Sequence, residues 1–353
     1  MKNKVIKIHT SELRAGMVVS RDFTVNSLRL LNKDVEITQR IAKKIKENYP
    51  EEFLEIYHPE ASLFSYVKKE TKDSIIKAEE FFKRITHNCY ELFSKLEADE
   101  DPDINIIREL SDDLLTTEIH QGLIMKNITT IRDLKEYNLT HSINTAILSV
   151  LLGRWLGYSQ RDLKLLSYAA LLHDIGKQKI HKKVLYKTGT LTAEEFKIMK
   201  LHSQLGYEIT KKIPYLDSSV AIAVLTHHER EDGSGYPLGL KGDSISNYSK
   251  IIAIADTFDA MTSNRVYRRK ICPLLVLEEL RDCSFRTLDP KLCQIFIKKI
   301  MNLYIGDNIL LNNGTTGTII KMDINAISKP LILTKEGFVD LSTSKDLTII
   351  DIA

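Results

Sequence analysis

The amino-acid sequence predicts a mainly α-helical protein with a small α+β module at its N-terminus and a small β cap at its C-terminus. Apolar residues recur at helical spacing through most of residues 68–300, whereas strict β alternation returns only after Ile305. The first 60 residues mix β-branched residues with turn signals. With 353 residues, 43% of them hydrophobic, the chain is long enough to bury a full core and to hold more than one domain.

We expect the N-terminal α+β module to span residues 1–62. Residues 11–19 are typical of a turn that leads into a strand. Residues 37–48 predict a helix, because Ile41, Ala42 and Ile45 fall on one face and Thr38 is suited to cap its start.

A helical connector is expected over residues 63–125. Residues 68–95 place apolar side chains at helical spacing, an acidic stretch with Pro102 breaks the pattern, and the spacing resumes over residues 106–115. Three interpretations stay open: a connector between domains, a dimerising coil, or helices that pack against the next domain.

The C-terminal part, residues 301–353, predicts a small β subdomain. Short strands are expected at residues 308–311, 317–321, 330–333 and 347–352, with Asn-Gly and Glu-Gly turns between them.

Composition bounds the function classes. Lys and Arg number 50 against 47 Asp and Glu, a net charge of +3 that argues against a general nucleic-acid-binding protein. The four cysteines form no C-x-x-C pair and are expected to be reduced thiols of a cytoplasmic protein. We expect no signal peptide, because residues 1–16 contain no apolar h-region. We also expect no membrane insertion, since the longest apolar stretch, residues 146–152, is too short to span a bilayer.

The central part, residues 126–300, contains a series of histidines beside apolar helical segments. His173 and Asp174 end the apolar run 162–172, and Gly176 follows as a candidate C-cap. His202 lies on a helix that the capping-box pair Thr192 and Glu195 predicts to begin there. Taken alone, each of these residues is better explained by an ordinary core or surface role.

Three further positions follow the same pattern. His141 precedes an apolar helical stretch, the doublet His227-His228 follows the apolar run 220–225, and Asp256 follows the run 251–255, at the boundary of a core helix. Neutral imidazoles and carboxylates gathered in one helical region are what a multi-metal hydrolytic centre requires. We therefore expect one shared metal centre rather than separate structural histidines.

Four sequence runs resemble motifs of the HD-GYP family, a branch of the HD phosphohydrolases. They are HSIN at 141–144, LHDIGK at 172–177, HHEREDGSGYP at 227–237 and ADTFDAMTSNR at 255–265. The resemblance covers residues 126–300, and the N-terminal module resembles the small domain that often precedes HD-GYP domains.

The resemblance implies a phosphodiesterase that hydrolyses cyclic di-GMP to pGpG and/or GMP on two divalent metal ions, iron or manganese. Asp174 would bridge the ions, and Lys177 would contact the scissile phosphate, which makes these two the catalytic residues. Arg265 and Arg268 would hold phosphates. The signature loop would shape the substrate site and contact partner domains. The implied metal ligands are His141, His173, Asp174, His202, His227, His228 and Asp256, and the signature loop is Gly235, Tyr236 and Pro237.

Two departures from the family pattern bear on this expectation. Tyr137 stands where some members have a glutamate that helps to hold a third metal, with Glu136 one residue earlier, so we expect two metals rather than three. Val266 stands where proline is common. For Arg265 and Arg268 the structural alternative is a solvated surface or an ion pair, and for the Gly-Tyr-Pro run it is an ordinary turn.

Alternative functions stay open at this stage. One is a catalytically inactive cyclic di-GMP receptor that signals through protein partners, and another is an HD hydrolase for a different cyclic dinucleotide. The long helices before residue 125 also suggest a homodimer.

Overall fold

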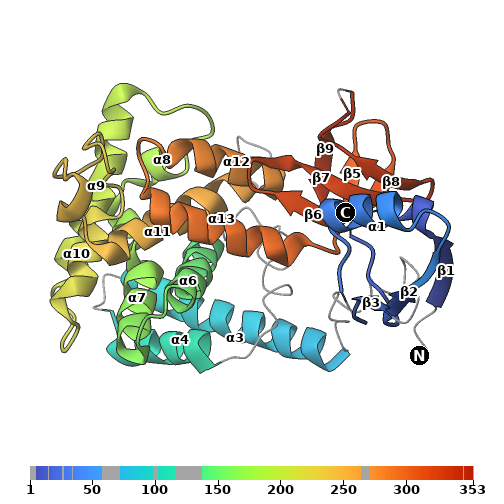
Figure 1. Ribbon diagram of the computed structural model, residues 1–353. Coiled ribbons are helices and arrows are strands. Elements are labelled where there is room, and N and C mark those ends of the chain that lie inside the picture. Colours follow the sequence, from blue (N-terminus) through green and yellow to red (C-terminus); the bar gives the residue numbers. More distant parts are fainter. Residues whose placement is uncertain are drawn as a thin grey trace. The chain divides into compact units, whose positions relative to one another are not determined.

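The computed structural model describes residues 5–14, 16–25, 28–33, 35–57, 72–97, 102–116, 137–263, 271–344 and 346–352 (Figure 1). The chain divides into two compact units, Met1–Glu70 and Thr71–Ala353. The mainly helical fold, with strands near both ends of the chain, confirms the predicted fold class. No helix among the described residues is long and apolar enough to cross a membrane.

The N-terminal unit is an α+β module. Its elements are β1 (Val5–His9), η1 (Thr10–Glu12), β2 (Phe23–Val25), β3 (Leu28–Leu31), α1 (Gln39–Asn48) and β4 (Phe53–Tyr57). Strand β1 pairs antiparallel with β4, and β2 pairs antiparallel with β3. The side chain of Thr38 accepts a hydrogen bond from the Ile41 amide, so the predicted cap of α1 is confirmed. Ala42 and Ile45 pack into a separate small core with Leu13.

The second unit is built on helices. They are α3 (Lys72–Glu97), α4 (Ile104–Thr116), α6 (Tyr137–Trp155), α7 (Gln160–Leu172), η3 (Ile175–Lys179), α8 (Lys182–Leu185), α9 (Ala193–Thr210), α10 (Ser218–Thr226), η4 (Gly242–Ser244), α11 (Asn247–Thr262), α12 (Pro273–Cys283) and α13 (Pro290–Tyr304).

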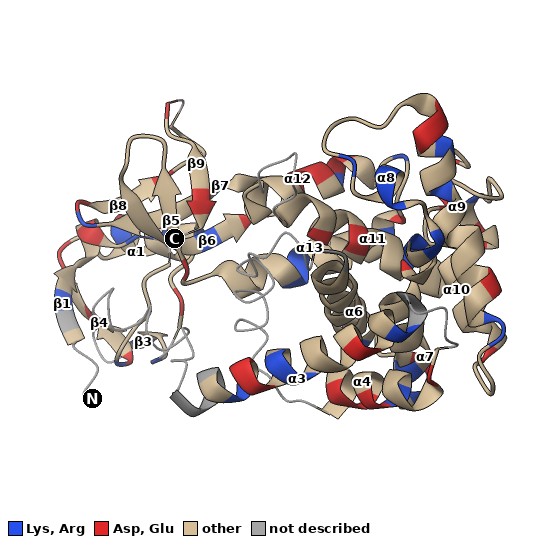
Figure 2. Cartoon of the chain, turned by 180° about the vertical axis from the view of Figure 1, so that it is seen from behind, with Lys and Arg blue, Asp and Glu red and all other residues tan. Residues whose placement is uncertain are grey.

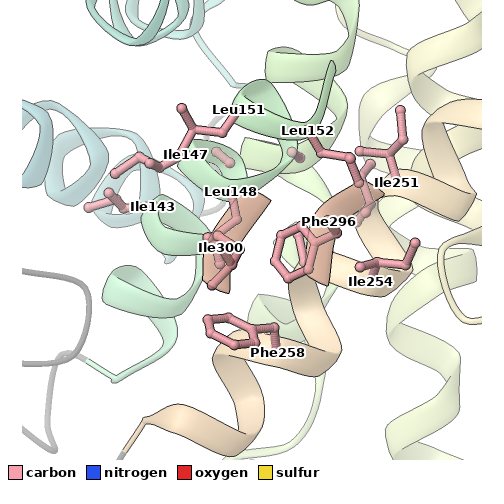
Figure 3. Packing of buried hydrophobic residues seen from close by; sticks show 14 of the residues in the cluster. Ile143, Ile147, Leu148, Leu151, Leu152, Ile251, Ile254, Phe258, Phe296 and Ile300 are labelled. Carbon is pink, nitrogen blue, oxygen red and sulfur yellow. The ribbon is translucent and has the colours of Figure 1, made fainter. Parts of the chain in front are cut away.

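Helix α6 lies at the centre of this unit and packs against both α7 and α11. In α6 the only Lys, Arg, Asp or Glu residue is Arg154, and residues 141–153 are all buried, so the helix is enclosed on every side. Figure 3 shows Ile147 and Leu148 of α6 in the same cluster as Phe258 of α11 and Phe296 of α13. This packing fixes α6 and α11 side by side, which matters because each carries a candidate ligand.

Helices α3 and α4 pack onto the same core. Ile85 of α3 and Ile107 of α4 are fully buried there, and Ser111 Oγ of α4 lies 2.5 Å from Ser167 Oγ of α7. Figure 2 shows charged residues distributed along both helices. Of the three interpretations of residues 63–125, the described helices therefore fit packing against the next domain. A dimer remains a prediction.

The C-terminal strands form one antiparallel sheet in the order β8-β7-β6-β5-β9. The strands are β5 (Asn308–Leu311), β6 (Thr316–Asp323), β7 (Ala326–Thr334), β8 (Gly337–Asp340) and β9 (Ile349–Ile352). The four predicted strands are confirmed, but the sequence reasoning missed β8, which pairs with β7 directly after the predicted Glu-Gly turn. The sheet is attached to α12, where Glu278 Oε1 accepts a hydrogen bond from the Ser328 amide.

Candidate metal centre

The candidate ligands reach the interior from the ends and middles of five α-helices. His141 lies in the first turns of α6, His202 in α9 and Asp256 in the middle of α11. His173 and His227 are the C-cap residues of α7 and α10, so each ends its helix facing the interior. The prediction that Asp256 stands at a helix boundary is wrong, because the apolar run before it continues as helix to Thr262.

The backbone sets the orientation of three imidazoles. The Nδ1 atoms of His173, His202 and His227 lie 2.8, 2.8 and 2.7 Å from the carbonyl oxygens three residues earlier, those of Ala170, Met199 and Val224. A carbonyl only accepts hydrogen bonds, so each Nδ1 carries the hydrogen and donates it. The Nε2 atom of each ring is then left with its lone pair free for a metal ion, which is the usual arrangement of metal-ligating histidines.

His141 is oriented by a side chain instead. Its Nδ1 lies 2.6 Å from Oδ2 of Asp259, and the Asp259 carboxylate also accepts hydrogen bonds from Asn144 Nδ2 at 2.8 Å and Ser263 Oγ at 3.1 Å. Asp259 is fully buried. The sequence reasoning assigned it no role, although it lies one helical turn after Asp256 within the run 255–265, and that spacing places both carboxylates on one face.

The ligand atoms form two adjacent groups. One comprises Asp174, His202, His227 and His228, and the other comprises His141, His173 and Asp256; within each group the ligand atoms lie within 4.8 Å of one another. The structure thus brings together all seven residues that the sequence singled out as ligands.

The Asp174 carboxylate lies between the two groups. Its Oδ1 is 3.4 Å from Nε2 of His202, while its Oδ2 is 3.4 Å from Nε2 of His173 and 3.6 Å from Nε2 of His141. One carboxylate oxygen therefore faces each group. Asp256 has a similar position, with Oδ1 3.1 Å from His141 Nε2 and Oδ2 3.9 Å from His228 Nδ1.

The electrostatics keep the imidazoles of the first group neutral. Burial lowers the pKa of His202, and burial together with the neighbouring imidazoles holds the pKa values of His227 and His228 well below their usual range. Burial would raise the pKa of Asp174, but the Lys177 ammonium and His173 outweigh it and hold that pKa well below its usual range. Neutral imidazoles and an ionised carboxylate are the protonation states that bind metal ions.

His141 differs from the other ligands. Burial alone would lower its pKa, but hydrogen bonds to Asp256 and Asp259 and the charges of these carboxylates raise it to about 9. Without a metal ion, His141 is thus a cation that compensates two buried carboxylates.

Two buried ligand atoms test whether a metal ion fits these residues. His173 Nε2 and Asp174 Oδ1 are buried and have no hydrogen-bond partner among the described residues. A buried polar atom without a partner costs free energy, and native structures rarely leave one unexplained. Imidazole nitrogens with carboxylate oxygens are a donor set that suits divalent first-row metals. The residues present therefore fit a divalent metal centre.

Comparison with known proteins agrees with this geometry. A family model described as "HD domain" matches residues 125–292. The chain is 38% identical over 177 residues to a cyclic di-GMP phosphodiesterase of Thermotoga maritima, a match that covers 50% of this chain and 47% of the relative. It is 27% identical over 224 residues to a cyclic di-GMP phosphodiesterase of Pseudomonas aeruginosa, covering 64% of this chain and 54% of the relative.

The chain belongs to the HD-GYP family. It is also 32% identical over 212 residues to a 3'3'-cGAMP-specific phosphodiesterase of Vibrio cholerae, covering 54% of this chain and 41% of that relative. The chain spans about half the length of the curated relatives it matches.

The HD-GYP signature loop lies against the first ligand group. Tyr236 stacks on His228, with ring centroids 4.7 Å apart and planes inclined by 31°, and it meets the His202 ring edge-on at 6.4 Å. Gly235 passes so close to the chain at 228–230 that a Cβ there would lie 2.5 Å from backbone atoms. The peptide bond between Tyr236 and Pro237 is cis. The close approach of Gly235 to the ligand-bearing segment makes the loop more than an ordinary turn.

Glu229, to which the sequence reasoning gave no role, holds this HD-GYP loop in place. Its carboxylate is buried and accepts hydrogen bonds from the amides of Leu238 at 2.7 Å and Leu240 at 2.9 Å. The Tyr236 amide donates to the carbonyl of His228 at 3.2 Å. The loop is therefore tied at both ends to the segment that carries two candidate ligands.

Lys177 lies beside the second ligand group of this HD-GYP domain. Its Nζ donates to Asp174 Oδ2 at 2.5 Å, one turn along η3. The ammonium is thus held next to the candidate bridging carboxylate.

Gly176 does not cap α7 as predicted, because the chain continues directly into η3. A Cβ at Gly176 would lie 1.9 Å from the His202 carbonyl oxygen and 2.5 Å from the Gly206 nitrogen. Glycine is required here by the close approach of η3 to α9, which brings Asp174 up to His202.

Several predicted HD-GYP positions lie outside the described residues. Arg265, Val266 and Arg268 belong to the segment 264–270, and Glu136 also falls outside them. Tyr137 begins α6, and its side chain is not described.

Proposed function

We propose that this chain is a metal-dependent phosphodiesterase that hydrolyses cyclic di-GMP to pGpG and/or GMP. The observation that carries the proposal is the arrangement of seven ligand residues in two adjacent groups, with the two oxygens of Asp174 facing one group each. Two adjacent metal sites are typical of enzymes that hydrolyse phosphate esters. The relatives from Thermotoga maritima and Pseudomonas aeruginosa, both named cyclic di-GMP phosphodiesterases, support the choice of substrate.

In this proposal the ligands hold two divalent ions, iron or manganese. His202, His227 and His228 would hold one ion, while His141, His173 and Asp256 would hold the other, with Asp174 shared between them. Bound ions of this kind lower the pKa of a coordinated water and polarise the phosphoryl oxygens. Tyr137, in the position where some family members have a glutamate ligand, supports a count of two ions rather than three.

The chain's own residues then have distinct roles. Lys177 would donate hydrogen bonds to the scissile phosphate while its contact with Asp174 keeps the ammonium at the centre. Arg265 and Arg268 would bind the phosphates, since a guanidinium can engage phosphate oxygens in pairs. Gly235, Tyr236 and Pro237 would form one wall of the substrate site, and Glu229 would hold that wall in place.

The proposed setting is a cytoplasmic signalling protein. The described structure has four free cysteines and no disulfide, which fits a reducing compartment. A homodimer and signalling partners that contact the signature loop belong to the same proposal.

A second cyclic dinucleotide is also a candidate substrate. Three relatives of Vibrio cholerae, 32 to 35% identical to this chain, are named 3'3'-cGAMP-specific phosphodiesterases. The two ligand groups would serve either substrate, because cleavage takes place at the phosphodiester and not at the base. Both nucleotides therefore belong in the same assay.

The test is hydrolysis by protein purified anaerobically and loaded with iron or manganese. Wild type is expected to convert cyclic di-GMP to pGpG, GMP or both, as separated by chromatography, whereas Asp174→Asn is expected to lose activity while keeping its fold. His87→Gln is the matched control, because His87 is an exposed histidine on α3 outside both ligand groups. Metal-loaded wild type without turnover of either nucleotide would reject the enzyme and favour the receptor alternative.

A further inference from the structure

Lys200 presents a cation beside the first ligand group. It lies on α9, and its Nζ is 4.8 Å from the ring centroid of Phe196 and 5.0 Å from that of Tyr236. Both distances are within the range of a cation–π contact. Two aromatic faces therefore hold this flexible side chain at a defined place.

Lys200 differs from three other lysines of this region, each of which has a carboxylate partner. Lys197 pairs with Glu194 at 2.8 Å, Lys187 pairs with Glu195 at 2.5 Å, and Lys177 donates to Asp174. Within the described part of the chain, Lys200 has no carboxylate at ion-pair distance and no hydrogen bond from Nζ. Its charge is therefore available to an anion from outside the protein.

The position of this charge is fixed relative to the ligands. Tyr236, which contacts Lys200, stacks on His228 and meets His202 edge-on, and both histidines belong to the first ligand group. Lys177 contacts Asp174 at Oδ2, the oxygen that faces His141 and His173. Two lysines thus lie beside the candidate centre, Lys177 at Asp174 and Lys200 at Tyr236.

We propose that Lys200 binds the phosphodiester of a cyclic dinucleotide that is not being cleaved, and that Phe196 and Tyr236 position its ammonium. A cyclic dinucleotide carries two phosphodiesters, each with one negative charge. When one of them lies at the metal centre with Lys177, the other can be met by the Lys200 ammonium, which lies against Tyr236. This inference rests on the proposed function and deepens it.

The expected kinetic signature follows from this role. A contact to the uncleaved phosphate is made equally in the ground state and in the transition state, so its loss raises KM and leaves kcat unchanged. A hydrogen bond to a charged group is strong enough for a change of about tenfold or more in KM. For a substrate with a single phosphodiester, removal of the Lys200 charge should change neither KM nor kcat.

The experiment compares Lys200→Met with wild type on cyclic di-GMP, 3'3'-cGAMP and bis(4-nitrophenyl) phosphate, which has a single phosphodiester. Methionine keeps the length and the helix propensity of lysine without the charge. We expect KM for a hydrolysed cyclic dinucleotide to rise about tenfold or more at unchanged kcat, unchanged kinetics with bis(4-nitrophenyl) phosphate, and substantial recovery in Lys200→Arg. Lys197→Met, on the same helix, is the control and should behave as wild type.

The outcomes separate the two proposals. If wild type hydrolyses a cyclic dinucleotide and Lys200→Met has the same KM, the assignment of Lys200 is overturned while the enzyme stands. Equal losses on both classes of substrate also overturn it, because they would indicate damage to the metal centre. If metal-loaded wild type cleaves neither cyclic dinucleotide, the proposed function is overturned and this inference with it.

Discussion

The substitution Gly176→Ala adds one methyl group and should move His202 away from Asp174 in the candidate metal centre. The new Cβ would lie 1.9 Å from the His202 carbonyl oxygen, whereas ordinary contact begins near 3.4 Å. The neighbour is helix backbone, so no side-chain rotation relieves the clash. Helix α9 must therefore move away from η3 by about 1.5 Å, taking His202 away from Asp174.

The magnitude follows from this displacement. Forcing an extra carbon into a packed interior costs about 1 to 3 kcal/mol of unfolding free energy. A displacement of about 1 Å at a catalytic group can reduce the rate about 100-fold. We therefore expect a lower urea midpoint, weaker metal binding by the first ligand group, and hydrolysis reduced about 100-fold.

The assay pairs urea denaturation with metal titration of the purified variant. Gly153→Ala is the control, because the closest atoms to its Cβ would be leucine methyl groups of α7, at 2.8 and 2.9 Å, and these side chains can move. The control should keep its metal content. If Gly176→Ala binds metal as tightly as wild type and unfolds at the same urea concentration, the close approach of η3 to α9 does not position the ligands.

Three further results are expected. Asp259→Asn should weaken metal binding about 10- to 100-fold in a chelator competition, because His141 loses its charged hydrogen-bond partner; unchanged affinity would contradict the orienting role. Glu229→Gln should lower the unfolding free energy by about 1 to 3 kcal/mol, since one loop amide loses a charged acceptor. A denaturation curve identical to that of wild type would show that the Glu229 hydrogen bonds do not stabilise the loop. Metal affinity should rise about tenfold per pH unit from pH 7 to about 9, because metal binding must displace the His141 proton over this range, and it should be constant at higher pH. An affinity that does not depend on pH would refute this prediction.

The same pKa has an effect on the metal-free protein. Because the pKa of His141 is raised from 6.5 to about 9 in the folded state, its protonation stabilises the metal-free fold fully below pH 6.5. That contribution disappears as the pH rises through about 9.

Local sequence patterns predicted much of this structure because their causes are local. Thr192 and Glu195 form the predicted capping box at the start of α9, and His202 follows on that helix. The doublet His227-His228 follows an apolar helix, and that helix ends at the candidate centre. Spacing and caps fix such features within a few residues of chain, so a single sequence reveals them.

Features that depend on distant contacts were missed or misassigned. Gly176 has the appearance of a C-cap in sequence, and only the packing of η3 on α9 shows why a side chain is excluded. Asp259 acts through His141, 118 positions away in the chain, and the sequence gives only its helical spacing from Asp256 as a hint. Glu229 accepts from amides of a loop whose path no local pattern predicts.

The metal content of anaerobically purified protein tests the central claim most directly. If the seven histidine and aspartate ligands converge on a pair of cations, elemental analysis should find two iron or manganese ions per wild-type chain. Folded Asp174→Asn, which lacks the shared carboxylate, should retain clearly less. A wild-type protein that binds neither ion when both are supplied would contradict the account.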